Sequence, residues 1–297
     1  MPSIGFVCPD EEKVLFEDCF DKCRMGHRCA TLAYLRMIAY DREWKGVTPS
    51  MAGNGPRLEY LKKTKPYHID PNDRVFAALG TGVHGKLSLF AYTDNILAEE
   101  PLSDEQTTGT PDCIEVDEEQ KGYYVLTDYK TWGSFKVAKA LGIVKITKDV
   151  PILDDKDNPI LLKSGPNKGQ PKTKKEHKFE KQADEVDMYE TELQLNRYRI
   201  LFEESDFPIS RIQIQACIRD GGTYTAKGRG ILNNKEIIPV RILTDPIVLN
   251  YYRILADDIG VADRTGYVRK CNKWESWDGR RCDGYCDVKQ YCDEMGD

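Results

Sequence analysis

Residues 109–130 read GTPDCIEVDEEQKGYYVLTDYK, and this stretch decides the fold. Two runs with the composition of strands, 111–116 and 123–131, are separated by an acidic turn that ends in Gly122. Short β-rich runs joined by a turn containing glycine are typical of a β-hairpin. The stretch therefore predicts two paired strands at the centre of the molecule.

The second strand of this hairpin carries two charged side chains on one face. Side chains alternate between the two faces of a strand, so Leu126, Asp128 and Lys130 share one side while Tyr129 points to the other. Asp128 can then bind a cation while Lys130 reaches the same reaction centre. An isolated Asp-x-Lys on a strand is more often an exposed charge pair, so the pattern needs support from the rest of the chain.

Periodicity outward from the hairpin predicts an α/β fold in which a central mixed β-sheet is flanked by helices. Expected helices lie at 132–141, 184–203 and 245–259, expected strands at 209–218 and 236–243, and another helix begins near Val83 with His84 in its first turn. Two helices joined near Met25–Gly26 are expected within 11–44, and 46–73 is expected to be loop. The predicted organisation is an N-terminal helical region with cysteines (1–73), a core (74–263) with a Lys-rich insertion (147–183), and a cysteine-rich C-terminal segment (264–297).

Length, charge and hydropathy exclude several classes of protein. The 297 residues suffice for one large domain, and the formal net charge of −6 argues against a passive nucleic-acid coat. No run approaches the roughly 20 apolar residues of a membrane span, and the N-terminus lacks the pattern of a secretion signal. We therefore expect an intracellular, cytoplasmic protein without a membrane partner.

Acidic residues on the two hairpin strands suggest a metal site. Asp112 and Asp128 can face each other and offer the hard oxygen ligands that suit Mg²⁺ or Mn²⁺, and His84 can complete the site. Such an ion supplies what phosphodiester cleavage needs, an activated water and neutralisation of the charge that builds up. Lys130 is then the candidate that stabilises the transition state. A helix-starting His84 is more often a capping or packing residue.

Four motifs follow one another in order: Gly80-x3-His84, Gly109-Thr110-Pro111-Asp112, Asp128-Tyr129-Lys130 and Gln194-x3-Tyr198. Gln194 and Tyr198 share one face of the expected helix. Without the other motifs, they would more often be an ordinary surface residue and a residue at the edge of the core. As an ordered set, the motifs resemble the RecB-like branch of the PD-(D/E)XK nucleases, similar to the CRISPR-associated RecB-like exonucleases with an iron–sulfur cluster. The resemblance covers roughly residues 25–292, and the motifs are specific only as a set.

The resemblance implies a restriction-endonuclease-like core and a PD-(D/E)XK deoxyribonuclease, an exonuclease acting on single-stranded DNA or DNA ends. It implies metal ligands at His84, Asp112, Asp128 and the Tyr129 carbonyl, a catalytic Lys130, and Gln194 and Tyr198 as a supporting helix motif. This chain has Asp128 where many members have Glu. Repair, recombination, phage replication and CRISPR adaptation all fit, with a helicase, recombination or integrase partner.

Eight of the ten cysteines lie near the two termini. The other two, Cys113 and Cys217, lie within expected strands, where a free cysteine is by default a small buried side chain. The same spacing occurs twice, in Cys19-x3-Cys23-x5-Cys29 and in Cys282-x3-Cys286-x5-Cys292. In a chain of this size without a secretion signal, this favours metal or cluster ligation over disulfides. Four thiolates suit either Zn²⁺ or a [4Fe-4S] cluster.

The resemblance implies a four-iron cluster held by Cys29, Cys282, Cys286 and Cys292, which would join the two ends of the chain as a cysteine-rich flap. Family members usually have two residues between the first pair of the C-terminal trio, and this chain has three. Two alternatives stay open: the left-over cysteines Cys19, Cys23 and Cys271 form a second four-thiolate site with Cys8, or one of them replaces a chosen ligand.

Basic and aromatic residues away from the metal site suggest contacts with DNA. Lys174 and Lys175 belong to a Lys-rich stretch that can engage phosphates, although a solvated loop explains it equally well. Tyr224, Lys227 and Arg229 lie in a glycine-containing loop that can approach a nucleic-acid backbone and stack a base, or form a plain turn. Two rival functions stay open, a catalytically silent or partner-dependent DNA-binding scaffold and a zinc protein in which Asp-x-Lys is accidental.

Overall fold

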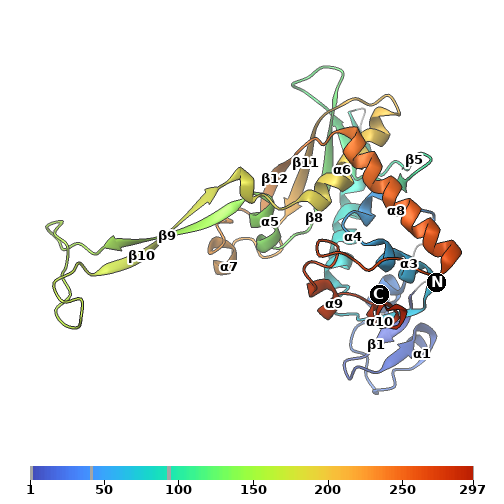
Figure 1. Cartoon of the computed structure of the whole chain (residues 1–297), viewed down its shortest axis with the longest axis horizontal. Coiled ribbons are helices and arrows are strands. Elements are labelled where there is room, and N and C mark those ends of the chain that lie inside the picture. The colour runs from blue at the N-terminus through green and yellow to red at the C-terminus, as the bar shows by residue number, and fades with distance from the viewer. Residues whose placement is uncertain (1–2, 41–42, 92–94, 297) are drawn as a thin grey trace. The chain divides into compact units, whose positions relative to one another are not determined.

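Strands and helices are interspersed along the whole chain, as expected for an α/β protein (Figure 1). The computed structural model describes residues 3–40, 43–91 and 95–296. The chain divides into two units: the first holds 1–131, 189–215 and 239–297, and the second holds 132–188 and 216–238. Within the described ranges, none of the helices has both the length and the apolar character that a membrane crossing requires.

The largest sheet has five strands in the order β12-β11-β8-β7-β4. Its members are β4 (Ile96–Ala98), β7 (Cys113–Val116), β8 (Tyr124–Lys130), β11 (Ile209–Cys217) and β12 (Lys235–Val240). The expected hairpin is present, since β7 pairs antiparallel to β8, and β4 pairs antiparallel to β7. Strand β11 runs in the same direction as β8, because Ser210 bonds the Tyr124 carbonyl and Gln213 bonds Thr127 further along. The mixed sheet is thus confirmed.

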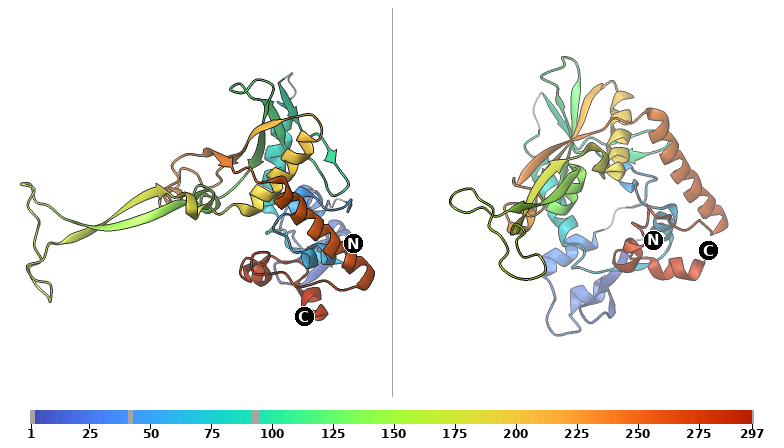
Figure 2. Two further views of the ribbon diagram at one scale, coloured as in Figure 1. Left: turned by 45° about the horizontal axis from the view of Figure 1, so that its top comes forward. Right: turned by 60° about the vertical axis from the view of Figure 1, so that its left-hand side comes forward.

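Two long helices build the main core of the first unit. Helix α6 (Tyr189–Glu203) and helix α8 (Asp245–Thr265) lie side by side (Figures 1 and 2), and both are close to their expected ranges. Helix α8 extends beyond its expected end and stops at Gly266, which takes the left-handed conformation that suits glycine. Their contacts bury a set of apolar side chains: Leu193, Ile200, Val248, Tyr252, Leu255 and Ile259.

The N-terminal lobe, residues 3–39 with 67–69, contains more strand than expected. Strands β1 (Ser3–Val7), β2 (Lys13–Leu15) and β3 (Tyr67–Ile69) form a sheet in the order β2-β1-β3, beside α1 (Phe16–Asp21) and α2 (Leu32–Ala39). The two expected helices exist but are short, and the strands were missed because each spans only three to five residues. The lobe's core contains Phe6, Cys19, Leu35 and Ile69.

The prediction of loop between residues 46 and 73 is wrong. A 3₁₀ turn, η1 (Pro49–Met51), and helix α3 (Pro56–Thr64) occupy that range. Helix α3 buries Arg57 and Glu59 together with Leu58 and Leu61, so part of its inner face is charged. Charged residues on the buried face hide the apolar period from which helices are predicted.

Helix α4 (Val75–Ser88) begins well before the expected start near Val83. The Gly80-Thr81-Gly82 sequence, which suggested a turn, lies inside the helix. Gly80 approaches the end of strand β8, since a Cβ placed there would meet Thr131 Oγ1 at 3.4 Å. His84 is therefore in the middle of α4, and its placement in the first turn is wrong.

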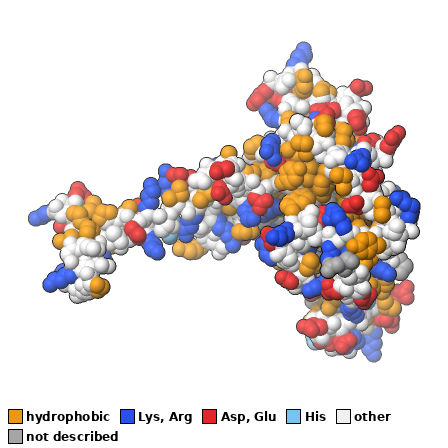
Figure 3. All heavy atoms as spheres, viewed as in Figure 1, with side chains coloured by type: hydrophobic (Ala, Val, Ile, Leu, Met, Phe, Trp, Pro, Cys, Tyr) orange, Lys and Arg blue, Asp and Glu red, His pale blue; other side chains and the backbone are white. Residues whose placement is uncertain are grey.

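The Lys-rich stretch of the second unit forms an antiparallel hairpin instead of a loop. Strand β9 (Ile143–Pro151) pairs with β10 (Thr173–Lys181) over nine residues each. Lysine and acidic side chains are interspersed along the hairpin (Figure 3). Strand β10 is polar on both faces, which conceals it from prediction. Helix α5 (Ser134–Ala140), the turn η2 (Ala183–Glu185) and the short helix α7 (Tyr224–Lys227) complete this unit.

The remaining short elements belong to the first unit. They are β5 (Leu102–Ser103), β6 (Thr108–Gly109), α9 (Arg280–Gly284) and α10 (Lys289–Met295). Helices α9 and α10 lie in the C-terminal cysteine-rich segment.

Candidate active site and cysteine centres

The β7–β8 pairing brings the two aspartates of the motifs together. Cys113 pairs with Thr127, so the same register continued by one residue puts Asp112 opposite Asp128. The Asp112 carboxylate also accepts a hydrogen bond from the Tyr129 backbone N–H at 2.6 Å. The strand that carries Asp128 thus fixes Asp112 at the open end of the hairpin.

His84 reaches this point from helix α4. Its Nδ1 lies 3.1 Å from Asp112 Oδ1, and its Nε2 lies 2.6 Å from the Tyr129 carbonyl oxygen. The hydrogen bond to Asp112 is the main reason that the pKa of His84 is raised, against the effect of its burial. Three of the four expected ligands, His84, Asp112 and the Tyr129 carbonyl, therefore converge on one point.

Glu99 joins these residues and was missed from the sequence. It follows strand β4 and donates its backbone N–H to the Asp112 carbonyl oxygen at 3.1 Å. One ligand atom from each of Glu99, His84 and Asp112 lies within 4.8 Å of the others. The sequence could have indicated Glu99 only through its place directly after a strand of the same sheet. The segment 95–98 is too short to be identified as that strand from the sequence.

Asp128 and Lys130 form an ion pair beside this group. Lys130 Nζ lies 2.7 Å from Asp128 Oδ2, with 4% of the Asp128 side chain and 21% of the Lys130 side chain exposed. Burial raises the pKa of Asp128 to about 6, with the nearby Asp112 charge adding to the effect. Burial alone would lower the pKa of Lys130, but the charge of Asp128 outweighs it and keeps the ammonium protonated.

Gln194 and Tyr198 approach the aspartates from α6. They share a side-chain hydrogen bond, and burial followed by the charges of Asp128 and Asp112 raises the pKa of Tyr198 well above its usual range. Gly109 permits the close approach, because a Cβ there would lie 2.8 Å from the Tyr198 ring. The glycine of the second motif is therefore explained by packing against the tyrosine of the fourth.

The donor set fits a divalent cation. His84, Glu99 and Asp112 present one nitrogen and two carboxylate oxygens at one point, a set that Mn²⁺ and Mg²⁺ accept. Asp128 lies outside this trio, and its buried Oδ2 is paired with the Lys130 ammonium at 2.7 Å.

Four cysteines surround a cavity of about 220 Å³ between α3 and the C-terminal segment. They are Cys271, Cys282, Cys286 and Cys292. Cys271, one of the cysteines left over in the sequence, lines this cavity, whereas Cys29, which the family resemblance gives as the fourth ligand, does not. Gly55 leaves space for this thiol, because a Cβ at Gly55 would lie 2.5 Å from Cys271 Sγ.

The cavity fits an anionic group larger than a single ion. Its volume is several times the roughly 30 Å³ that one water molecule occupies in the liquid. Arg57 lines it, with Nη1 3.7 Å from Cys292 Sγ, and its buried Nη2 has no hydrogen-bond partner among the described residues. A four-thiolate [4Fe-4S] centre carries negative charge that this guanidinium would offset.

We expect Arg57→Ala to lower the free energy of unfolding by about 3 kcal/mol, in the range for breaking a buried charged network. Arg57 is fully buried and donates to the carbonyls of Val268, Cys292 and Gly296, so its loss leaves them without this donor. Thermal melting measures the loss. The control is Lys63→Ala on the same helix, which removes an exposed ion pair with Asp263 worth less than about 1 kcal/mol. Equal melting temperatures for both variants would contradict this role of Arg57.

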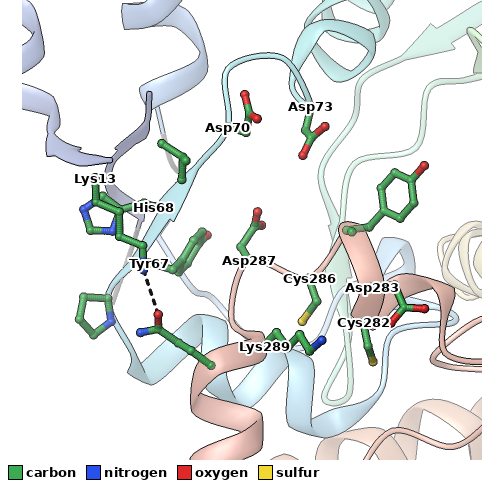
Figure 4. A pocket seen from close by; sticks show the side chains of 15 residues that line it. Lys13, Tyr67, His68, Asp70, Asp73, Cys282, Asp283, Cys286, Asp287 and Lys289 are labelled. Carbon is green, nitrogen blue, oxygen red and sulfur yellow. Dashed lines mark hydrogen bonds between the residues drawn. The ribbon is translucent and has the colours of Figure 1, made fainter. Parts of the chain in front are cut away.

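A second cavity, of about 330 Å³, shares Cys282, Cys286 and Lys289 with the first. It lies where the N-terminal lobe meets the C-terminal segment, and Asp70, Asp73, Asp283 and Asp287 line it (Figure 4). Lys13 of β2 donates to Gln290 of α10 at 2.9 Å, and Arg74 pairs with Asp287 at 2.7 Å. These contacts hold the two ends of the chain together independently of any cysteine ligand.

Cys29 lies with the other N-terminal cysteines. Burial, and then the charges of Cys8 and Cys23, raise the pKa of its thiol. Of the two cysteines within expected strands, Cys113 is buried in β7 with 1% of its surface exposed, whereas Cys217 at the end of β11 is only half-buried.

The residues suggested for DNA contact all belong to the second unit. Lys174 and Lys175 lie on the exposed strand β10, where Lys174 pairs with Glu176 at 2.9 Å. Tyr224 begins α7 with 93% of its surface exposed, and Lys227 ends that helix. Arg229 is engaged within the unit, since it donates to Ser134 Oγ at 2.9 Å and lies 3.5 Å from Asp220.

Comparisons with known proteins leave the family open. No protein-family model matches the chain, and no curated protein matches it. One solved structure, described as "Crystal structure of SSO0001", is similar with 14% sequence identity and a TM-score of 0.42, covering 87% of this chain and 91% of that chain. The chemistry of the site itself must therefore support any functional assignment.

Proposed function

We propose that this chain is a metal-dependent DNA nuclease with a restriction-endonuclease-like core of the PD-(D/E)XK type. The observation that carries the proposal is the convergence of His84, Asp112 and the Tyr129 carbonyl beside the Asp128–Lys130 pair. These groups come from three separate motifs, yet they meet at the end of one hairpin. An accidental Asp-x-Lys pair would not be expected to have these neighbours.

The residues have distinct roles in hydrolysis. His84, Asp112, Asp128 and the Tyr129 carbonyl would hold Mn²⁺ or Mg²⁺, with Glu99 as a further ligand. When bound, such an ion polarises the scissile phosphate and makes a water molecule a better nucleophile. Water attacks phosphorus as the bond to the leaving sugar oxygen breaks. Lys130 places its ammonium beside the phosphate oxygens, where negative charge increases.

Tyr198 and Gln194 would position the site instead of reacting. The packing of Tyr198 against Gly109 and its closeness to both aspartates fix the segment that carries Asp112. We propose that the exposed Tyr224 stacks on a base of single-stranded DNA, and that Lys174, Lys175 and Lys227 contact phosphates.

The C-terminal cavity would hold a [4Fe-4S] cluster through Cys271, Cys282, Cys286 and Cys292. Its role is structural in this proposal, because it ties a segment with few buried apolar residues to α3. Metal ligation contributes directly to folding in such segments.

The proposed activity is tested with end-labelled single- and double-stranded DNA and a matched RNA. Each is incubated with anaerobically purified protein in Mn²⁺, Mg²⁺ or chelator. We expect ion-dependent release of label from DNA, fastest from single strands or ends. Cleavage of RNA alone would refute a deoxyribonuclease.

Asp112→Asn should abolish the stabilisation of the protein by Mn²⁺. An ion at a hundred times its dissociation constant stabilises the native protein by about 2.7 kcal/mol. The variant removes a negative ligand and should show no Mn²⁺-induced rise in melting temperature. Asp117→Asn is the control, because Asp117 lies on the same hairpin but bonds Ser210 away from the trio. The same Mn²⁺ response in wild type and Asp112→Asn would mean that the ion binds elsewhere.

A further inference from the structure

The N-terminal lobe brings a second set of four cysteines together. Cys8 follows strand β1, Cys19 lies on α1, Cys23 follows that helix, and Cys29 precedes α2. Burial, and then the charges of Cys8, Cys23 and Cys29, raise the pKa of the Cys19 thiol. Four thiols from a stretch of 22 residues therefore belong to one lobe, and Cys8, Cys23 and Cys29 lie near enough to Cys19 for their charges to act on its thiol.

The backbone around these thiols is held in tight turns. Cys8 opens the β1–β2 turn, in which its N–H and carbonyl bond Glu12 and Glu11 at 2.8 Å each. Cys23 Sγ lies 2.9 Å from the His27 carbonyl. Hydrogen bonds thus fix the chain at Cys8 and at Cys23, two of the four positions that a tetrahedral thiolate site requires.

Positive charge accompanies the thiols. Arg24 hydrogen-bonds to Cys8 and pairs with Asp10, linking the β1–β2 turn to the loop after α1. Arg28 donates to the carbonyls of Phe20 and Asp21 at 2.9 and 3.3 Å, which fixes the other side of that loop. The two arginines thus fix both sides of the loop that carries Cys23.

Apolar packing gives this loop little support. The lobe's core contains Cys19 but not Cys8, Cys23 or Cys29, and Cys29 is exposed. Residues 22–31 have no regular secondary structure. An exposed thiol beside three others in a loop of this kind is better explained by ligation than by packing.

We propose that Cys8, Cys19, Cys23 and Cys29 bind one Zn²⁺ ion that stabilises the N-terminal lobe. A single ion suits this lobe better than a cluster. Only Cys29 of the four lines the 400 Å³ cavity on its surface, whereas four sulfurs surround the C-terminal cavity. A zinc ion is held directly by four thiolates at Zn–S distances of about 2.3 Å, so it requires no cavity. This site is independent of the nuclease activity.

Metal content of the full chain tests the proposal. Zinc and iron per chain are measured by mass spectrometry for wild type, Cys23→Ser, Cys286→Ser and His27→Ala, all purified without added zinc or iron. We expect about one zinc per chain in wild type, its loss in Cys23→Ser, and its retention in Cys286→Ser and His27→Ala. His27 is the matched control because it lies in the same loop but outside the proposed ligand set.

Alkylation of native wild type gives a second readout that does not depend on a variant folding. Cys29 is exposed, so a free thiol there would react at once. We expect it to resist iodoacetamide until zinc is chelated, and to be protected again when zinc is added back. Immediate alkylation in zinc-loaded protein, full zinc in Cys23→Ser, or loss of zinc in His27→Ala would each overturn the four-cysteine zinc site.

Discussion

Lys130→Ala should reduce the rate of DNA cleavage by about 10²–10³-fold, the typical cost of removing one group that stabilises a developing negative charge. The ammonium lies 2.7 Å from Asp128 and remains partly exposed, so it is fixed in place and accessible to substrate. Binding of DNA should change little, because one phosphate contact contributes only a small part of a multi-lysine interface. Single-turnover cleavage of end-labelled DNA measures the rate, and fluorescence anisotropy measures binding.

Two further variants separate catalysis from folding. Lys130→Met keeps the aliphatic stem that packs beside Asp128 and removes only the charge, so it should be as inactive as Lys130→Ala at a temperature where circular dichroism shows both variants to be folded. Lys121→Ala changes an exposed lysine in the turn of the same hairpin and should be fully active. If Lys130→Met cleaved DNA at the wild-type rate, Lys130 would have no catalytic role.

Cys271→Ser should remove the iron and destabilise the C-terminal segment, whereas Cys29→Ser should leave the iron in place. Cys271 lines the cavity with the three C-terminal cysteines, and Cys29 does not. A structural metal centre can contribute about 10 kcal/mol or more to folding, so its loss is expected to expose 264–297 to proteolysis. The loss of iron is measured as iron per chain and as the visible absorbance of the cluster. The exposure of 264–297 is measured by limited proteolysis.

The opposite pattern would restore the ligand set that the family resemblance implies. Loss of iron in Cys29→Ser with normal iron in Cys271→Ser would place the cluster between the N-terminal cysteine and the C-terminal trio. Zinc instead of iron in the C-terminal site of wild type would show that the cavity holds a single ion.

The elements nearest the active site are those that the sequence predicts best. Strands β7 and β8 are runs containing β-branched and aromatic residues on either side of an acidic turn, and α6 is buried along most of its length, so local composition suffices to identify them. Their order along the chain then suggested which side chains would meet. His84, Asp112 and the Tyr129 carbonyl do meet, although His84 comes from the middle of a helix whose start was misplaced.

Contacts between distant segments could not be predicted in this way. Glu99 approaches Asp112 because β4 pairs with β7, and a three-residue strand leaves almost no periodic signal. Cys271 lines the C-terminal cavity because α3 packs against the C-terminal segment, and the buried Arg57 and Glu59 hide α3 from prediction. The repeated cysteine spacing indicated two groups of ligands but not how the left-over cysteines complete them.

The proposed function requires an ion held by His84, Asp112 and Asp128 for the cleavage of DNA. Its most direct test is a Mn²⁺ titration of label release from single-stranded DNA, with Mn²⁺ binding followed in parallel by the shift in melting temperature. We predict no release without Mn²⁺, and release that saturates over the same concentrations that stabilise the protein. Saturated Mn²⁺ binding with no cleavage of any DNA, or cleavage that persists in chelator, would contradict the claim.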